Sequence, residues 1–211
     1  VMKKSGDRKQ LRKKMKKVQD GRRFEHTLGV AYTAAALAMR YHASIEDAQT
    51  AGMLHDCAKC LSDKKMQELC EKGGIFLSDF EKRNLFLMHG RVGAYLAKEK
   101  YGIENEDIIN AIAWHTTGRE NMSLLEKIIF VADYIEPGRR QAPNLPEIRE
   151  LAFLDLDRAM IRILEDTIVY LKNGRGEIDP ATEKTLMFYK KEPAWKNVPG
   201  KEDWNGKRTG I

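Results

Sequence analysis

The chain has 211 residues, and its 37 Lys and Arg against 31 Asp and Glu give a formal net charge of +6. A hydrophobic content of 42% beside 32% charged residues is typical of a folded domain and argues against a wholly disordered chain. No apolar run approaches the roughly 18 residues of a membrane span. No apolar segment follows the basic N-terminus as it would in a secretory signal.

The positive charge is concentrated at the two ends of the chain. Residues 1–20 hold nine basic side chains against two acidic ones, and residues 190–211 hold six against three. The 169 residues between them hold 22 basic against 26 acidic side chains, so the body of the protein is mildly acidic.

Helical periodicity begins near the N-terminus. Leu11, Met15 and Val18 share one face of a Lys-rich amphipathic segment at residues 8–20. Residues 22–41 are rich in Ala, Leu and Met and predict a long, largely buried helix.

Caps and glycines mark the helices that follow. Ser44 begins a helix expected to run through residues 52–59, and Ser62 begins a shorter one that Gly73 and Gly74 end. The segment 137–146, which contains three prolines, is expected to be irregular. Further helices are expected at 80–87, 90–101, 105–115, 123–136, 155–172 and 180–190.

No pair of segments shows the period-two alternation of β-strands, so we predict an all-α fold. The expected division is a basic N-terminal extension at residues 1–20, a folded domain at 21–190 and a mobile C-terminal tail at 191–211.

Four of the five histidines, His26, His55, His89 and His115, lie in or at the ends of predicted core helices. A buried imidazole without a partner is costly, so something should satisfy each of them. His42, near the end of a helix, is assigned no role.

Two carboxylates share these apolar surroundings. Asp56 follows His55 directly, with Lys59 one helical turn further on, and Asp133 lies within an apolar helix. Any one of these residues could be an ordinary buried side chain with a hydrogen-bond partner. As a set, nitrogen and oxygen ligands without a thiolate predict a catalytic Fe, Mn or Zn site with open positions.

The order of these six residues resembles the ligand set of HD-domain metal-dependent phosphohydrolases. The flanking sequences are similar to the YqeK-type family, whose members cleave diadenosine tetraphosphate symmetrically into two ADP. The resemblance covers about residues 22–189 and implies an HD-domain helical bundle with a metal centre in its core. The segments that carry it are 23–30, 54–59, 89–94, 115–118 and 132–139.

The resemblance implies one or two divalent ions, with iron expected and manganese as the alternative. Asp56 would bridge the two positions, or His89 and His115 would instead bind substrate phosphates if only one ion is present. Attack of a metal-bound hydroxide on a phosphate would then need no covalent enzyme intermediate. The first ion would be held by His26, His55, Asp56 and Asp133, and the second site would be lined by His89 and His115.

Substrate contacts are expected around the metal, because an acidic body needs basic side chains near the ligands to attract a polyanion, and the segment 178–182 resembles the family's C-terminal segment near the nucleotide. Asp56, Lys59 and Asp133 are the expected catalytic residues. The expected substrate-binding residues are Arg23, Lys59, His89, His115, Thr116, Thr117, Asp133, Arg139, Ile178 and Thr182. The implied ligand is a dinucleoside polyphosphate or a nucleoside diphosphate. We expect no membrane partner, and a homodimer is the assembly considered.

Two other functions are weighed against this one. Another HD phosphohydrolase could act on mononucleotides or cyclic dinucleotides, although the Gly-Tyr-Pro element of the latter group is missing. A nucleic-acid or ribosome-associated module could use the basic ends, but no recognised nucleic-acid fold signature accompanies them.

The three cysteines, Cys57, Cys60 and Cys70, are odd in number and clustered. We expect no disulfide scaffold, and a reducing cytoplasm is the expected location. Cys57 and Cys60 have the spacing of a redox or zinc motif, but no second pair exists to complete a zinc knuckle. We therefore expect Cys57 to pack against a neighbouring helix.

Overall fold

The computed structural model describes residues 8–174 and 177–191, and within these ranges it contains helices but no strands. The predicted all-α class is confirmed. None of the described helices is both long and apolar enough to cross a bilayer. The helices in chain order are α1 (Arg8–Val18), α2 (Gly21–Arg40), α3 (Ile45–Leu54), α4 (Asp63–Lys72), α5 (Asp79–Arg83), the 3-10 helix η1 (Leu85–Met88), α6 (His89–Glu99), α7 (Glu106–Trp114), α8 (Leu124–Ile135), α9 (Leu145–Leu154), α10 (Leu156–Asn173) and α11 (Pro180–Lys191).

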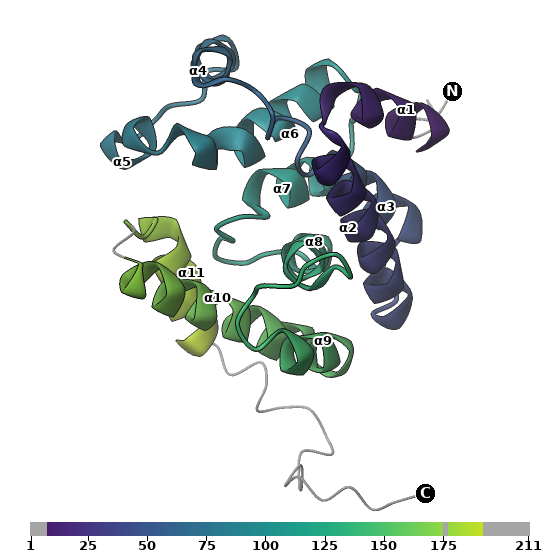
Figure 1. The fold of residues 1–211 in the computed structure, drawn as a ribbon, viewed down its shortest axis with the longest axis vertical. Helices are drawn as coiled ribbons and strands as arrows, with labels where there is room; N and C mark the ends of the chain where they lie inside the picture. Colours follow the sequence, from purple (N-terminus) through teal and green to yellow (C-terminus); the bar gives the residue numbers. More distant parts are fainter. Residues whose placement is uncertain (1–7, 175–176, 192–211) are drawn as a thin grey trace, which may run out of the picture.

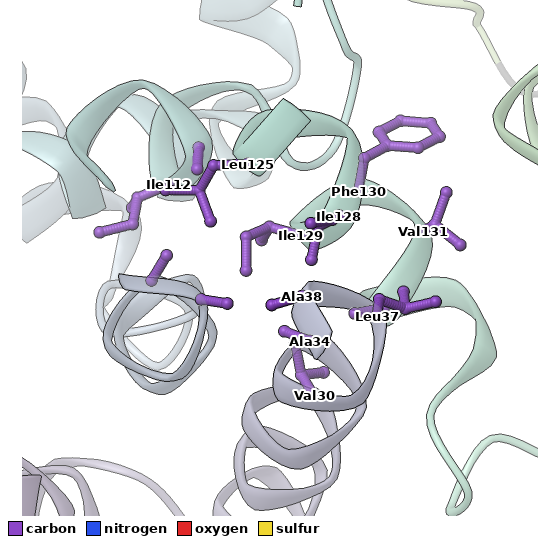
Figure 2. Packing of buried hydrophobic residues seen from close by; sticks show 14 of the residues in the cluster. Val30, Ala34, Leu37, Ala38, Ile112, Leu125, Ile128, Ile129, Phe130 and Val131 are labelled. Carbon is purple, nitrogen blue, oxygen red and sulfur yellow. The ribbon is translucent and has the colours of Figure 1, made fainter. Parts of the chain in front are cut away.

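Helix α8 lies at the centre of the bundle and packs against α2, α7 and α10 (Figure 1). Its residues Ile128 and Ile129 are fully buried, and Figure 2 shows them close to Ala34 and Ala38 of α2. Small side chains on α2 let the two helices approach closely, so the branched side chains of α8 fill the space between them. This contact positions residue 133 of α8 opposite the start of α2.

Helices α2 and α3 approach each other even more closely. A Cβ placed on Gly52 of α3 would lie 2.8 Å from the Cα of Ala31 on α2. Only a glycine fits at that distance from backbone atoms, so the crossing fixes the end of α3 against the middle of α2. The ends of α3 and α2 that carry His55 and His26 are thereby held together.

The predicted caps form, but α3 is shorter than expected. Ser44 and Ser62 each accept a hydrogen bond from the backbone N–H three residues on. Helix α3 ends at Leu54, and residues 55–60 form turns with hydrogen bonds to the carbonyl three residues back, such as Lys59 to Asp56 at 3.1 Å. The prediction of a continuous helix through residues 52–59 was wrong, because the chain tightens into three-residue turns after Leu54.

Two further differences concern the middle and the C-terminal half. The expected helix at 80–87 divides into α5 and η1, because Asn84 leaves the helical conformation between them. Helix α9 was missed because Pro146 suggested a loop. Proline is tolerated in the first turn of a helix, where its absent N–H would have had no partner, and Pro146 lies there.

Helix α1 packs onto α2 and α3 through two of the three apolar side chains that the sequence placed on one face, and the third, Val18, is 40% exposed. Leu11 and Met15 are buried in the main core cluster, whereas the Lys and Arg side chains of α1 are exposed. Residues 8–18 are thus anchored to the bundle, although the sequence suggested an extension. The part of the predicted C-terminal tail beyond Lys191 lies outside the described residues.

We expect Met15→Ala to lower the free energy of unfolding by about 2 to 5 kcal/mol, because it removes a fully buried side chain and leaves a cavity. Lys16→Ala, at the next and exposed position, should change it by less than about 0.5 kcal/mol. Chemical denaturation of both variants measures the difference. Equal effects would mean that α1 is not anchored as described.

Candidate metal centre

The four clustered histidines are delivered by four different parts of the bundle. His26 lies in the second turn of α2, His55 follows α3, His89 begins α6 and His115 follows α7. Their rings form a chain of edge-to-face neighbours with centroids 4.9 to 5.3 Å apart. All four are buried or nearly so.

The carboxylate of Asp56 lies between these rings and divides them into two pairs. Its Oδ2 is 3.8 Å from Nε2 of His26 and 3.4 Å from Nε2 of His55. Its Oδ1 is 3.3 Å from Nε2 of His89 and 3.7 Å from Nε2 of His115. Each oxygen of one buried carboxylate thus serves its own pair of imidazoles.

Asp133 on α8 completes the cluster from the opposite side. Its Oδ1 is 3.1 Å from Nε2 of His26 and accepts a hydrogen bond from Arg139 at 2.9 Å. Three groups of three side chains, drawn from six residues, bring ligand atoms within 4.8 Å of one another. These groups are His26, His55 and Asp56; His55, His115 and Asp133; and Asp56, His89 and His115.

The donor set fits a divalent metal ion. Imidazole nitrogens and carboxylate oxygens converge without a thiolate, which suits Fe, Mn or Zn. The Nδ1 atoms of His55, His89 and His115 lie 2.6 to 2.7 Å from the backbone carbonyls of the residues three positions earlier. A carbonyl only accepts, so each Nδ1 carries a proton and each Nε2 faces the cluster.

The electrostatics keep the carboxylates ionised. Burial alone would raise the pKa of Asp56, but the imidazoles of His55 and His115 outweigh it and hold that pKa below its usual range. Burial would also raise the pKa of Asp133, and the hydrogen bond from His26 with the nearby Arg139 lowers it instead. Two negative charges therefore face each other inside the bundle, which favours a cation between them.

The surroundings of two histidines shift their pKa values in opposite directions. Burial, with His115 and Lys59 nearby, lowers the pKa of His89 to about 3, so this ring stays neutral and available as a ligand. Burial would lower the pKa of His26 as well, but its contacts with Asp133 and Glu136 raise that pKa.

The fold and the site have clear counterparts among known proteins. The family model described as "HD domain" matches residues 23–138, which contain all six clustered side chains. The chain belongs to the HD-domain family. The expected resemblance is confirmed, and the segment that matches ends just after α8.

The relatives of this HD-domain protein narrow the group. A Bacillus subtilis protein named "Bis(5'-nucleosyl)-tetraphosphatase, symmetrical" is 41% identical, over 79% of this chain and 88% of its own. A protein of the same name from Halalkalibacterium halodurans is 43% identical, over 77% and 86%. A crystal structure of a predicted HD superfamily hydrolase involved in NAD metabolism, from Clostridium acetobutylicum, aligns with a TM-score of 0.85 at 40% identity, over 88% and 97%.

The structure places three of the expected substrate-binding cations beside the cluster of this HD-domain protein. Arg23 donates to Oδ2 of Asp56 at 2.7 Å, and Arg139 pairs with Asp133. The Lys59 amino group lies 3.3 Å from both ring nitrogens of His89, and burial lowers its pKa.

Of the other expected contacts, Thr116 is the one with a described contact to the cluster. Thr116 Oγ1 is 3.2 Å from Nε2 of His89, whereas Thr117 Oγ1 donates to the carbonyl of Gly118. Ile178 follows Glu177, whose carboxylate accepts from Asn84 just before η1.

Thr182 is the expected contact for which the structure describes only local hydrogen bonding. It is buried at the start of α11, and its N–H bonds the carbonyl of Asp179. One turn further along α11, Thr185 would lie 2.8 Å from a Cβ on Gly118, which brings α11 against the loop that carries Thr116.

Two residues that support the cluster were missed by sequence reasoning. Gln19, between α1 and α2, donates from Nε2 to the backbone carbonyl of Asp56 at 3.2 Å. Glu136 contacts His26 from the end of α8. Neither has a ligand-like spacing in the sequence, although Glu136 lies in the segment that resembles the family.

The cysteines are free thiols in the structure. Cys57 is buried against α6, where its Sγ lies 3.5 Å from the carbonyl of Gly93, and burial raises its pKa to about 12. It is therefore a packing residue and a poor metal ligand.

We expect Asp56→Ala to weaken divalent metal binding by more than the roughly 10- to 100-fold typical of changes outside the ligand set, because both halves of the cluster lose their shared carboxylate. Metal content after purification without chelators, and titration of the stripped protein with Mn²⁺, measure this loss. Asp63→Ala, at an exposed position in α4, is the control and should keep the wild-type metal content.

Proposed function

We propose that this protein is a metal-dependent hydrolase that cleaves diadenosine tetraphosphate symmetrically into two ADP. The observation that carries the proposal is the sharing of Asp56 between two pairs of histidines, an arrangement that would suit two adjacent metal ions. The names of the relatives, similar over most of both chains, support the substrate.

One or two ions of iron, with manganese as the alternative, suit the imidazole and carboxylate ligands. His26, His55, Asp56 and Asp133 would hold the first ion, and Asp56 with His89 and His115 would hold the second. When bound, such ions supply an activated water at neutral pH and neutralise charge on the phosphates.

The chain itself supplies the remaining positive charge. Arg23, Lys59 and Arg139 surround the two carboxylates, each within hydrogen-bond reach of a clustered side chain. With metal in the centre, Arg23 and Arg139 would leave Asp56 and Asp133 and pair with the phosphates of a tetraphosphate chain. These side chains would then orient the phosphates for in-line attack, because phosphoryl transfer depends on positioning and charge neutralisation.

Asp133 would help to hold the attacking water beside the metal. Its carboxylate stays ionised, and its side chain is only partly buried beside His26. Lys59 is held against His89 and would bind the phosphate that is attacked. Asp56, Lys59 and Asp133 are thus the proposed catalytic residues.

The nucleoside would lie toward the edge formed by the loop after α7 and the start of α11. Thr116 borders His89 there, Thr117 is its neighbour, and the segment of Ile178 is tied to the start of η1 through Glu177. Thr182 would support this edge from within α11.

The proposal extends to the partner, the location and the assembly of the protein. The partner is a small dinucleoside polyphosphate or a nucleoside diphosphate, with no membrane or nucleic-acid partner required. The free thiols suit a reducing cytoplasm. A homodimer is kept as the assembly to test by light scattering.

Purified protein loaded with Fe²⁺ or Mn²⁺ should convert diadenosine tetraphosphate to ADP as the sole nucleotide product, because symmetrical cleavage breaks a bond of the central bridging oxygen. Chromatography of the products decides the outcome. AMP with ATP would show asymmetric cleavage. No turnover, combined with hydrolysis of mononucleotides or cyclic dinucleotides, would favour another HD phosphohydrolase.

We expect Lys59→Met to lower kcat/KM by about 10- to 100-fold, the loss of one hydrogen bond from a charged donor to the reacting phosphate. Metal content should stay at the wild-type level, since Lys59 is not a ligand. Lys64→Met, at an exposed position of α4, is the matched control. Unchanged kcat/KM for Lys59→Met would remove this residue from the substrate contacts.

A further inference from the structure

One of the four histidines is oriented differently from the other three. His55, His89 and His115 each direct Nδ1 at the backbone carbonyl three residues earlier, at 2.7, 2.6 and 2.7 Å. The Nδ1 of His26 instead lies 3.1 Å from Oε1 of Glu136, which is 110 residues further along the chain.

The position of each histidine in its helix explains this difference. His55 and His115 follow the last residues of α3 and α7, and His89 lies at the junction of η1 and α6. Backbone carbonyls in the last turn of a helix have no intrahelical partner and are free to accept from a side chain. His26 lies within α2, where the carbonyl three residues earlier belongs to the helical hydrogen-bond ladder. Its acceptor must come from another element.

Glu136 is itself held in place on both sides. It follows the last residue of α8 and is only 4% exposed. Its Oε1 faces His26, its Oε2 accepts the backbone N–H of Gly138 at 2.6 Å, and its backbone carbonyl accepts from Arg149 at 2.9 Å. The carboxylate therefore has little freedom to turn away from His26.

Helix α2 has a space that the carboxylate fills. A Cβ placed on Gly29 would lie 2.4 Å from Oε2 of Glu136 and 3.2 Å from its Cδ. Any other residue at position 29 would displace the carboxylate. Gly29 is one turn from His26, so the missing side chain lies next to the histidine that Glu136 contacts.

We propose that Glu136 is a positioning residue that orients His26 for metal binding. This inference rests on the metal centre of the proposed function. A carboxylate only accepts hydrogen bonds, so Glu136 holds a proton on Nδ1. Nε2, which faces Asp56 and Asp133, is then the atom left to bind a metal ion once it gives up its own proton. A carboxylate acceptor also makes the imidazole a stronger ligand than a carbonyl would.

Calorimetric titration of the metal-free protein with Mn²⁺ tests the role of Glu136 without any substrate. We expect Glu136→Ala to raise the Kd for Mn²⁺ by about 10- to 100-fold. Glu136→Gln keeps an oxygen acceptor without the charge, so its Kd should lie between those of wild type and Glu136→Ala.

Glu126→Gln is the matched control. Glu126 is another buried carboxylate on α8, but it pairs with Arg119 and caps its own helix at Ser123. Its loss should lower the melting temperature and leave the Kd for Mn²⁺ unchanged. If the role of Glu136 were purely structural, Glu136→Ala would likewise lower the melting temperature and leave the Kd for Mn²⁺ unchanged.

Gly29→Ala gives an independent test with the native carboxylate present. Gly21→Ala is the control for this variant, because a Cβ at Gly21 would meet nothing within 4 Å, and it should leave the Kd for Mn²⁺ unchanged. Gly29→Ala should instead raise the Kd for Mn²⁺, because the new methyl group displaces Glu136. This variant and Glu136→Gln decide the question if Glu136→Ala does not fold.

Wild-type affinity in Glu136→Ala, or an equal loss in Glu126→Gln, would overturn the inference. Its failure is distinct from that of the proposed function. Wild-type protein that binds Mn²⁺ but does not cleave diadenosine tetraphosphate would contradict the substrate and leave the role of Glu136 to the titrations.

Discussion

The buried carboxylate of Asp56, shared by four imidazoles, is the interaction on which the rest of this structure depends. An isolated carboxylate in a helical core would be costly, and its hydrogen bond from Arg23 satisfies only one side of it. The two histidine pairs suit the carboxylate to a role as a shared metal ligand, because each of its oxygens faces a separate group of candidate ligands. The packing of α8 on α2 and of α3 on α2 brings these groups together.

Helix ends are the means by which the bundle orients its ligands. Three histidines direct Nδ1 at the backbone carbonyl three residues earlier, and for His55 and His115 that carbonyl lies in the last turn of a helix, so the local backbone sets the direction of these rings. His26 is the exception because it lies inside α2, and Glu136 with Gly29 replaces the missing carbonyl. The end of α8 thus contributes to the centre twice, through Asp133 as a ligand and through Glu136 as a support.

Much of the fold followed from local patterns. Ser44 and Ser62 predicted helix starts because a cap depends on residues within four positions, and the apolar face of α1 predicted the burial of Leu11 and Met15. Helix α9 was missed because Pro146 has two meanings, a loop signal and an acceptable first-turn residue, and local sequence does not distinguish them. The end of α3 was misplaced because the turns at 55–60 depend on contacts with other helices.

The sequence by itself determined the kind of chemistry. Four histidines and two aspartates in apolar surroundings indicate a metal centre, since burying them otherwise would cost too much, and their flanking residues indicate the family. Only the tertiary structure decided how the ligands are divided between the two oxygens of Asp56 and which partner orients each ring. Those relations join residues up to 110 positions apart, such as His26 and Glu136, and depend on where helices end and cross. Helix crossings are set by packing of side chains over the whole core, which no local pattern contains.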